Sequence, residues 1–181
     1  MTTSKQIKSN ISKEGKLTIS IDEVDVPEPK DGEVLIKVQA TPINPSDLGL
    51  LVGPADVASI KVIEEGSLVE MQVPDELIRS VAARFDQNLP VGNEGAGVVE
   101  AAGKGAEHLI GKVVGVAGGA MYSEYRCLPA MSCLEMNEGT SAEQAASCFV
   151  NPLTALGMVE TMRLENHTGL VHTAAASNLG Q

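Results

Sequence analysis

The sequence predicts a β-rich domain of the α+β class, followed by the opening of an α/β unit. Hydrophobic residues make up 43% and charged residues 20% of the 181 residues, which is a globular composition. Before Pro152 the chain is mostly short stretches that alternate apolar and polar residues, as half-buried strands do. After Pro152 it changes to a helix, an apolar stretch and a glycine-containing loop, which indicates the start of a βαβ unit.

The first strands are the clearest. In residues 33–40, Val34 and Ile36 share one face with two further apolar residues, while polar residues occupy the other face. Residues 16–29 also alternate, and end at two prolines that predict a turn. The prolines and Asn in 41–47 indicate a structured loop that leads into a short turn of helix.

Residues 53–87 form an insertion of different character. Strands are expected at 61–63 and 68–73. A helix is expected over 74–86, because Pro74 and Asp75 suit a helix start. Five apolar side chains would share one face of this helix: Leu77, Ile78, Val81, Ala82 and Phe85.

The rest of the chain continues with strands and then helices. Strands are expected within residues 89–105, 111–118 and 121–129. Thr140 stands three residues before Glu143, which predicts a capped helix start.

A long helix is expected over residues 151–164, with a buried stripe of Leu153, Leu156 and Val159. A short strand at 169–173 would then run into a loop of small residues. His172 would lie inside this strand as a core residue.

Charge and composition exclude several classes of protein. The chain has 13 Lys and Arg against 24 Asp and Glu, a net charge of −11, and no basic run. Aromatic residues are only 2%, with no Trp. Nucleic acids and anionic membranes are therefore not expected partners, because both require basic surfaces. Three cysteines without a close pair argue against a disulfide framework. No secretion signal is recognisable, so we expect a cytoplasmic protein.

Five motifs in order carry a family resemblance: INPSD at 43–47, GNEGAGVVEAAG at 92–103, YSEYRCLPA at 122–130, EQAASCFVNPLTA at 143–155 and VHTAAASNLGQ at 171–181. Together they resemble the medium-chain dehydrogenase/reductase superfamily. The resemblance is to its zinc-independent branch of quinone-oxidoreductase-like and enoyl-thioester-reductase-like enzymes. It covers most of the chain except the insertion.

The resemblance implies a β-rich GroES-like barrel (α+β) followed by the first strand of a Rossmann α/β domain. The catalytic domain would span residues 1–151, and the Rossmann domain would begin within 152–181. NADPH, with NADH as the alternative, would bind in the cleft between the domains. We expect the chain to be the N-terminal part of a longer protein, inactive alone and homodimeric when complete.

The resemblance also assigns candidate site residues. Asn44 and Ser46 would form the substrate pocket and polarise a carbonyl through an amide N–H and a hydroxyl. Asn44 has a second interpretation, as a turn-stabilising residue before Pro45. Asp47 would anchor this loop by accepting hydrogen bonds.

Cofactor contacts are expected at Asn151 and Thr154, near the nicotinamide ring. Thr154 has a second interpretation, as a helix-start residue whose hydroxyl bonds the backbone. Ala174, Ser177 and Gly180 would belong to the turn that binds the pyrophosphate.

No metal site is expected. Zinc-dependent relatives place a Cys where Asn44 stands, a His where Asn93 stands and a third ligand near Val150. Amides are poor zinc ligands, and Glu94 alone cannot hold the metal. Glu94 is either a carboxylate left beside a former metal site or a structural acid. Cysteines and histidines elsewhere offer no catalytic arrangement.

The predicted function is hydride transfer from NAD(P)H to a quinone or conjugated carbonyl without zinc. An enoyl-thioester reductase is the first alternative, although no Tyr lies near Ala55, where such enzymes carry a proton donor. A non-catalytic GroES-like binding or structural protein is the second. A metal-dependent alcohol dehydrogenase is a third.

Overall fold

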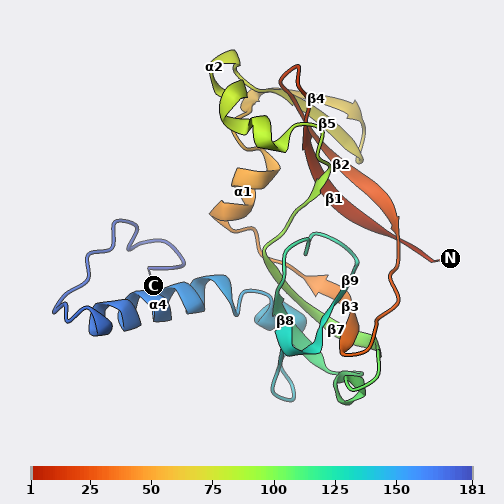
Figure 1. The fold of residues 1–181 in the computed structure, drawn as a ribbon, viewed down its shortest axis with the longest axis vertical. Helices are drawn as coiled ribbons and strands as arrows, with labels where there is room; N and C mark the ends of the chain where they lie inside the picture. Colours follow the sequence, from red (N-terminus) through yellow and green to blue (C-terminus); the bar gives the residue numbers. More distant parts are fainter. Residues whose placement is uncertain (1, 181) are drawn as a thin grey trace.

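A computed structural model describes residues 2–180, which contain two five-stranded antiparallel sheets and a projecting helix (Figure 1). The first sheet has the order β4-β5-β2-β1-β6 and the second the order β10-β8-β7-β3-β9. The strands of the first sheet are β1 (Thr3–Ile11), β2 (Lys16–Asp25), β4 (Asp56–Glu64), β5 (Leu68–Gln72) and β6 (Leu89–Pro90). Those of the second are β3 (Glu33–Ala40), β7 (Glu94–Ala102), β8 (Val113–Ala117), β9 (Tyr125–Pro129) and β10 (Cys133–Glu135).

Helices are few and mostly short. They are α1 (Pro45–Leu51), α2 (Asp75–Ile78), α3 (Ala142–Ala145) and α4 (Val150–Leu164), with 3₁₀ turns at Arg79–Arg84, Glu107–Leu109 and Ala130–Ser132. None of the helices in residues 2–180 is long and apolar enough to cross a membrane.

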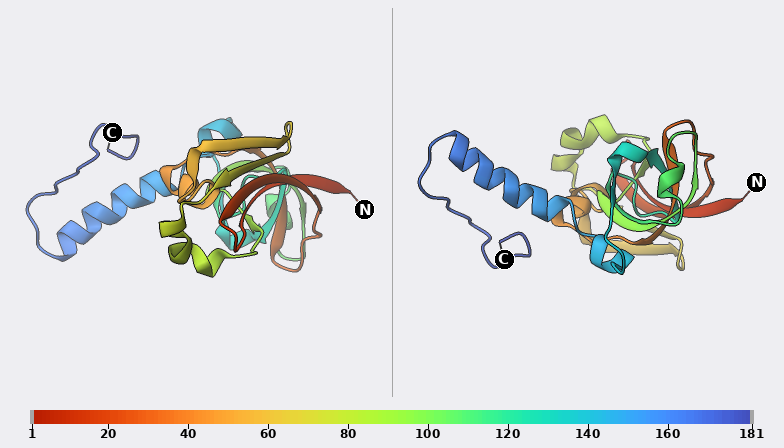
Figure 2. Two further views of the ribbon diagram at one scale, coloured as in Figure 1. Left: turned by 90° about the horizontal axis from the view of Figure 1, so that it is seen from above. Right: turned by 90° about the horizontal axis from the view of Figure 1, so that it is seen from below.

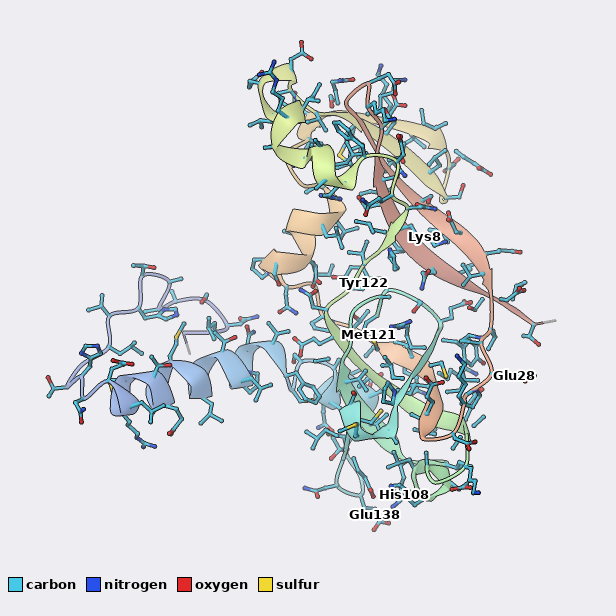
Figure 3. All side chains as sticks on the ribbon, in the orientation of Figure 1. Lys8, Glu28, His108, Met121, Tyr122 and Glu138 are labelled. Atoms are coloured by element: carbon cyan, nitrogen blue, oxygen red, sulfur yellow. The ribbon has the colours of Figure 1, made fainter. Side chains whose placement is uncertain are left out.

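Backbone hydrogen bonds join the two sheets beside β1. The N–H of Ile7 donates to the carbonyl of Tyr122 at 2.8 Å, and the N–H of Glu124 donates to that of Lys5 at 3.0 Å. The sheets therefore curl around a shared interior as part of a barrel, and Met121 and Tyr122 lie in the segment between them (Figure 3). The predicted β-rich architecture is confirmed in this part of the chain.

The second sheet packs the larger core. Val34 and Ile36 of β3 are fully buried, as their alternation predicted, and they pack with Val114 and Val116 of β8. Gly97 of β7 lies directly on the backbone of β3, where an added Cβ would collide with the carbonyl of Lys37. The absence of a side chain at this position allows the two strands their close approach.

The insertion folds as a hairpin of β4 and β5 followed by α2 and a 3₁₀ turn. The predicted helix over 74–86 is wrong in detail, because only Asp75–Ile78 is α-helical. In a 3₁₀ turn residues three apart share a face, so Ile78 and Val81 pack on the core of the first sheet. Leu77 and Ala82 are exposed instead.

The start of α3 differs from the prediction by one residue. Ser141 is the N-cap, and its hydroxyl accepts from the N–H of Gln144 at 3.3 Å. The side chain of Gln144 accepts in return from the N–H of Ser141 at 2.9 Å. The predicted box of Thr140 and Glu143 is therefore wrong, because the neighbouring pair has the same spacing and takes its place.

Helix α4 forms as predicted but projects from the sheets (Figures 1 and 2). Its predicted buried stripe is wrong: Leu153 and Leu156 are each 56% exposed, because no described element packs on that face.

The predicted first Rossmann strand at 169–173 is absent too. These residues follow an extended loop that turns back along α4, and His172 is only half-buried. A parallel strand needs a neighbouring strand to satisfy its backbone, and residues 2–180 offer none there.

Candidate functional site

Glu94 is the buried charge at the centre of the site. It is the first residue of β7 and is fully buried. Its Oε1 accepts from Asn44 Nδ2 at 3.0 Å. Its Oε2 accepts from the backbone N–H groups of Phe149 and Val150, both at 2.9 Å. One carboxylate therefore connects the loop before α1 to the beginning of α4.

The position of Glu94 follows from the electrostatics of α4. The first N–H groups of a helix have no partner within the helix and carry partial positive charge. Val150 is the first residue of α4, so the Glu94 carboxylate satisfies such donors and complements the helix dipole. These bonds give Glu94 a structural role, and its relation to a former metal site stays a prediction.

Asp47 orders the opposite side of the site. It is buried, and its Oδ2 accepts from the N–H of Asn44 at 2.8 Å. Its Oδ1 accepts from the N–H of Asn93 at 2.9 Å. The predicted anchoring role of Asp47 is confirmed, because both oxygens hold backbone groups.

A cavity of about 530 Å³ opens between the loop before α1, the start of α4 and the C-terminal loop. It brings together six of the seven predicted site residues: Asn44, Ser46, Asn151, Thr154, Ala174 and Ser177. Gly180 does not line this cavity; its N–H donates to the carbonyl of Ser177 at 2.9 Å. The volume lies within the range typical of small-molecule sites.

Several polar groups of the cavity already have partners. Thr154 is exposed, and its hydroxyl donates to the carbonyl of Val150 at 2.6 Å, so the helix-start interpretation describes its present contact. Ser46 accepts from Asn93 Nδ2 at 2.9 Å, which leaves the hydroxyl proton of Ser46 for another acceptor. Asn44 gives one amide hydrogen to Glu94 and keeps the second.

The loop over residues 174–180 closes on itself. The hydroxyl of Ser177 donates to the carbonyl of Ala174 at 2.7 Å, and the N–H of Ser177 donates to the same carbonyl at 2.9 Å. These bonds use groups that a pyrophosphate turn would present to its ligand. The pyrophosphate-binding role of Ala174, Ser177 and Gly180 stays a prediction.

Sequence reasoning missed the apolar cavity beside this site. It measures about 390 Å³ and shares Ile43 with the first cavity. Tyr122 lines it and donates its hydroxyl to the carbonyl of Pro42 at 3.1 Å. Burial raises the pKa of Tyr122 above its usual range, so the phenol stays protonated. No sequence signal distinguished Tyr122 from a structural tyrosine, because its neighbours come from distant segments.

The residues at the site do not suit a zinc ion. Both oxygens of Glu94 are engaged by N–H donors, and Asn44 and Asn93 present amides. Burial, followed by the neighbouring Glu94, raises the pKa of Cys148, which disfavours the thiolate. Across residues 2–180 no three His, Cys, Asp or Glu side chains are grouped to hold a metal. His108 lies at the far end of the second sheet (Figure 3).

Two curled antiparallel sheets, with a buried acid at the start of a projecting helix, are the architecture of an N-terminal GroES-like domain of the medium-chain dehydrogenase/reductase superfamily. Residues 30–172 match the family model of the alcohol dehydrogenase GroES-like domain. The chain therefore belongs to this family, and the superfamily resemblance is confirmed.

Individual relatives are similar to this chain in sequence or in fold. A zinc-type alcohol dehydrogenase-like protein of Schizosaccharomyces pombe is 31% identical over 151 residues, which cover 79% of this chain and 37% of the relative. Among solved structures, a candidate NADPH:quinone reductase from Mesorhizobium loti is similar with a TM-score of 0.68 and 25% identity, over 99% of this chain and 51% of the other. The quinone oxidoreductase from Coxiella burnetii has a TM-score of 0.62 and 20% identity, over 90% of this chain and 46% of the other.

A mycobacterial protein solved with NADPH shares the fold, with a TM-score of 0.56 and 22% identity over 98% of this chain and 46% of the other. The chain thus spans about half the length of these solved structures and 37% of the curated relative.

Proposed function

We propose that the complete protein is an NADPH-dependent oxidoreductase that reduces a quinone or a conjugated carbonyl without zinc. The observation that carries the proposal is the shared cavity, in which the predicted substrate residues Asn44 and Ser46 face the predicted cofactor residues Asn151 and Thr154. The similarity to the candidate NADPH:quinone reductase of Mesorhizobium loti supports the same substrate class.

Different side chains would bind the cofactor and the acceptor at the two ends of the cavity. Bound NADPH would supply the hydride. Asn151 and Thr154 would hold its nicotinamide end through their amide and hydroxyl groups, while Asn44 and Ser46 would bind the acceptor. The second amide hydrogen of Asn44 and the hydroxyl of Ser46 are donors for a substrate carbonyl, and would stabilise negative charge as it develops on oxygen.

The donor set favours catalysis without a metal. The Glu94 carboxylate accepts three hydrogen bonds and would lose them on binding zinc. The N–H groups at the beginning of α4 would then have no acceptor. A quinone or conjugated carbonyl is electrophilic enough to accept hydride with hydrogen-bond assistance alone. This proposal stands against the zinc-type description of the yeast relative.

The test is NADPH oxidation by the complete protein with quinones, enones, saturated ketones and enoyl thioesters offered separately. Turnover of quinones or enones, and loss of that turnover in Asn44→Ala, are the expected results. Preference for enoyl thioesters would instead support the first alternative, an enoyl-thioester reductase. Turnover of none of them, with NADPH still bound, would support a binding protein.

A further inference from the structure

Helix α1 carries two of the candidate site residues and is held mainly at its ends. Asn44 is its N-cap, Ser46 lies in its first turn, and the helix has only seven residues. A helix of this length is not stable by itself. Among residues 45–51 Asp47 alone is buried, and Leu48 in the middle of the helix is 45% exposed. The contacts at the two ends of α1 therefore fix where Asn44 and Ser46 lie.

The C-terminal end of α1 is held by side chains from other elements. The last four carbonyl groups of an α-helix have no partner within the helix. One of these in α1, the carbonyl of Leu51, accepts from Ser9 Oγ of β1 at 3.0 Å. Two others, the carbonyls of Gly49 and Leu50, accept from the guanidinium of Arg84 at 3.4 and 2.7 Å. The same guanidinium donates to Ser9 Oγ at 3.3 Å, so the two side chains hold this end of the helix together.

The charge of Arg84 is directed at α1. Arg84 is the last residue of the 3₁₀ turn that follows α2, and this turn lies beside α1 in Figure 1. No carboxylate within residues 2–180 forms an ion pair with Arg84. Its electrostatic partner is therefore the partial negative charge at the C-terminus of the helix. An added Cβ at Gly53 would lie 3.0 Å from Arg84 Nη1, so the glycine leaves room for the guanidinium.

The turn that carries Arg84 is itself fixed to the core of the first sheet. Val81 and Phe85, on either side of Arg84 in the sequence, pack on the buried cluster that contains Leu17. Val52, the C-cap of α1, packs on the same cluster. The guanidinium therefore extends to α1 from a packed part of the insertion, and not from a free loop.

We propose that Arg84 is a positioning residue for the acceptor and acts through α1. Its guanidinium holds one end of a helix about 10 Å long, and the other end presents Asn44 and Ser46 to the candidate site. No residue of the insertion 53–87 lines that cavity, so the insertion orders the substrate side without touching the substrate. The inference rests on the proposed function, because it concerns the residues that would bind the acceptor.

The test is steady-state kinetics of the complete protein, with NADPH and the acceptor varied separately. Arg84→Met keeps an apolar chain in place but removes every donor of the guanidinium. The KM for the acceptor should rise about tenfold, the equivalent of one hydrogen bond. The KM for NADPH should change by less than about twofold, because Asn151 and Thr154 belong to α4 and not to α1. Arg84→Lys should give an intermediate KM for the acceptor, since an ammonium keeps the charge but lacks the planar fork that reaches two carbonyls.

Two control variants separate positioning from loss of stability. Arg79→Met changes an exposed arginine of the same turn and should leave both KM values unchanged. Val114→Ala, in the core of the second sheet, should lower the melting temperature without raising the KM for the acceptor. An equal rise in the KM for the acceptor in either control would overturn the role of Arg84.

A double variant tests whether the effect passes through the site residues. Arg84→Met/Asn44→Ala should lose less kcat/KM than the product of the two single losses, because residues that act through one another are not additive. A loss equal to the full product would overturn the coupling between Arg84 and Asn44.

Amide hydrogen exchange separates this inference from the proposed function. In Arg84→Met the amides of residues 44–53 should exchange about tenfold faster than in the unchanged protein, whatever the acceptor is. A complete protein that reduces no acceptor would refute the proposed function, and the exchange result would still decide the role of Arg84. Unchanged exchange over 44–53, or an unchanged KM for the acceptor in an active Arg84→Met variant, would overturn the positioning role.

Discussion

The side chains of Glu94 and Asn44 are joined by a hydrogen bond of 3.0 Å, although fifty residues separate them in the sequence. The same carboxylate accepts from Phe149 and Val150 at the start of α4. The substrate side and the cofactor side of the candidate site therefore share one buried acid. Changes at Glu94 should alter both.

Glu94→Gln should lower the free energy of unfolding by about 2 kcal/mol. The amide has one oxygen in place of two, so its NH₂ group would face one of the N–H donors that now bond to the carboxylate, and the remaining hydrogen bonds would be to a neutral group. The amide also lacks the charge that complements the N-terminus of α4. Chemical denaturation measures the effect. Glu100→Gln, on the same strand but partly exposed, is the matched control and should cost less than about 0.5 kcal/mol. Equal effects of the two changes would contradict a special role for Glu94.

Thr154→Val should reduce kcat/KM of the complete enzyme by up to about a hundredfold while changing the melting temperature little. Valine retains the shape of threonine, and the hydroxyl that is removed donates only to the backbone carbonyl of Val150 in α4. Steady-state kinetics and thermal melting should be measured on the same preparation. Normal kinetics with a lower melting temperature would mean that the hydroxyl serves the helix alone.

Purified complete protein should contain no stoichiometric zinc, and its turnover should survive a strong chelator. The reason is that the candidate ligands are two amides and a carboxylate whose oxygens are engaged. Elemental analysis followed by assay before and after chelation tests this. Zinc at one equivalent that tracks with activity would refute both the metal-free chemistry and the role of Asn44.

Gly97→Ala should destabilise the protein by about 2 kcal/mol, because the new methyl group would collide with the carbonyl of Lys37 across two paired strands. Gly157→Ala is the matched control. Gly157 lies within α4 with nothing near its Cβ position, so alanine there should stabilise the helix by about 0.5–1 kcal/mol. Opposite signs in denaturation experiments are the expected outcome.

The thiols of Cys127 and Cys133 should react slowly. Burial raises the pKa of both from 9.0 to about 11, so the thiolate fraction of the folded protein at pH 8 is about a hundredfold below that of the unfolded chain. The folded state then holds more protons than the unfolded state above pH 9.0, so stability falls as pH rises from 9.0 to about 11. Alkylation rates of folded and unfolded protein, and melting between these pH values, test the two statements. Equal alkylation rates would contradict the burial of these thiols.

Local pattern predicted the strands well because each strand carries its own alternation. Val34 and Ile36 are buried as their period of two requires. The stripe on α4 was wrong for a related reason. Leu153 and Leu156 have helical spacing, but spacing does not reveal whether a partner surface is present. The absent strand at 169–173 has the same cause, because a strand depends on its neighbours.

At the site, the motifs predicted six residues that line one cavity, but not how those residues are bonded. The three contacts of Glu94 come from segments at least fifty residues away, so no short motif contains them. The apolar cavity beside Tyr122 depends in the same way on distant strands.

The anchoring of α4 at one end has a mechanical consequence. The helix has 15 residues and buries none of them. It is therefore a stiff lever about 22 Å long, and a rotation of about 5° at Glu94 would displace its far end by about 2 Å. Thr154, one turn from the pivot, would hardly move, whereas Leu164 at the tip would sweep through most of that distance. Rotation of α4 about its hydrogen bonds to Glu94 would therefore displace any segment attached to the far end of the helix, while the polar groups nearest Glu94 keep their spacing.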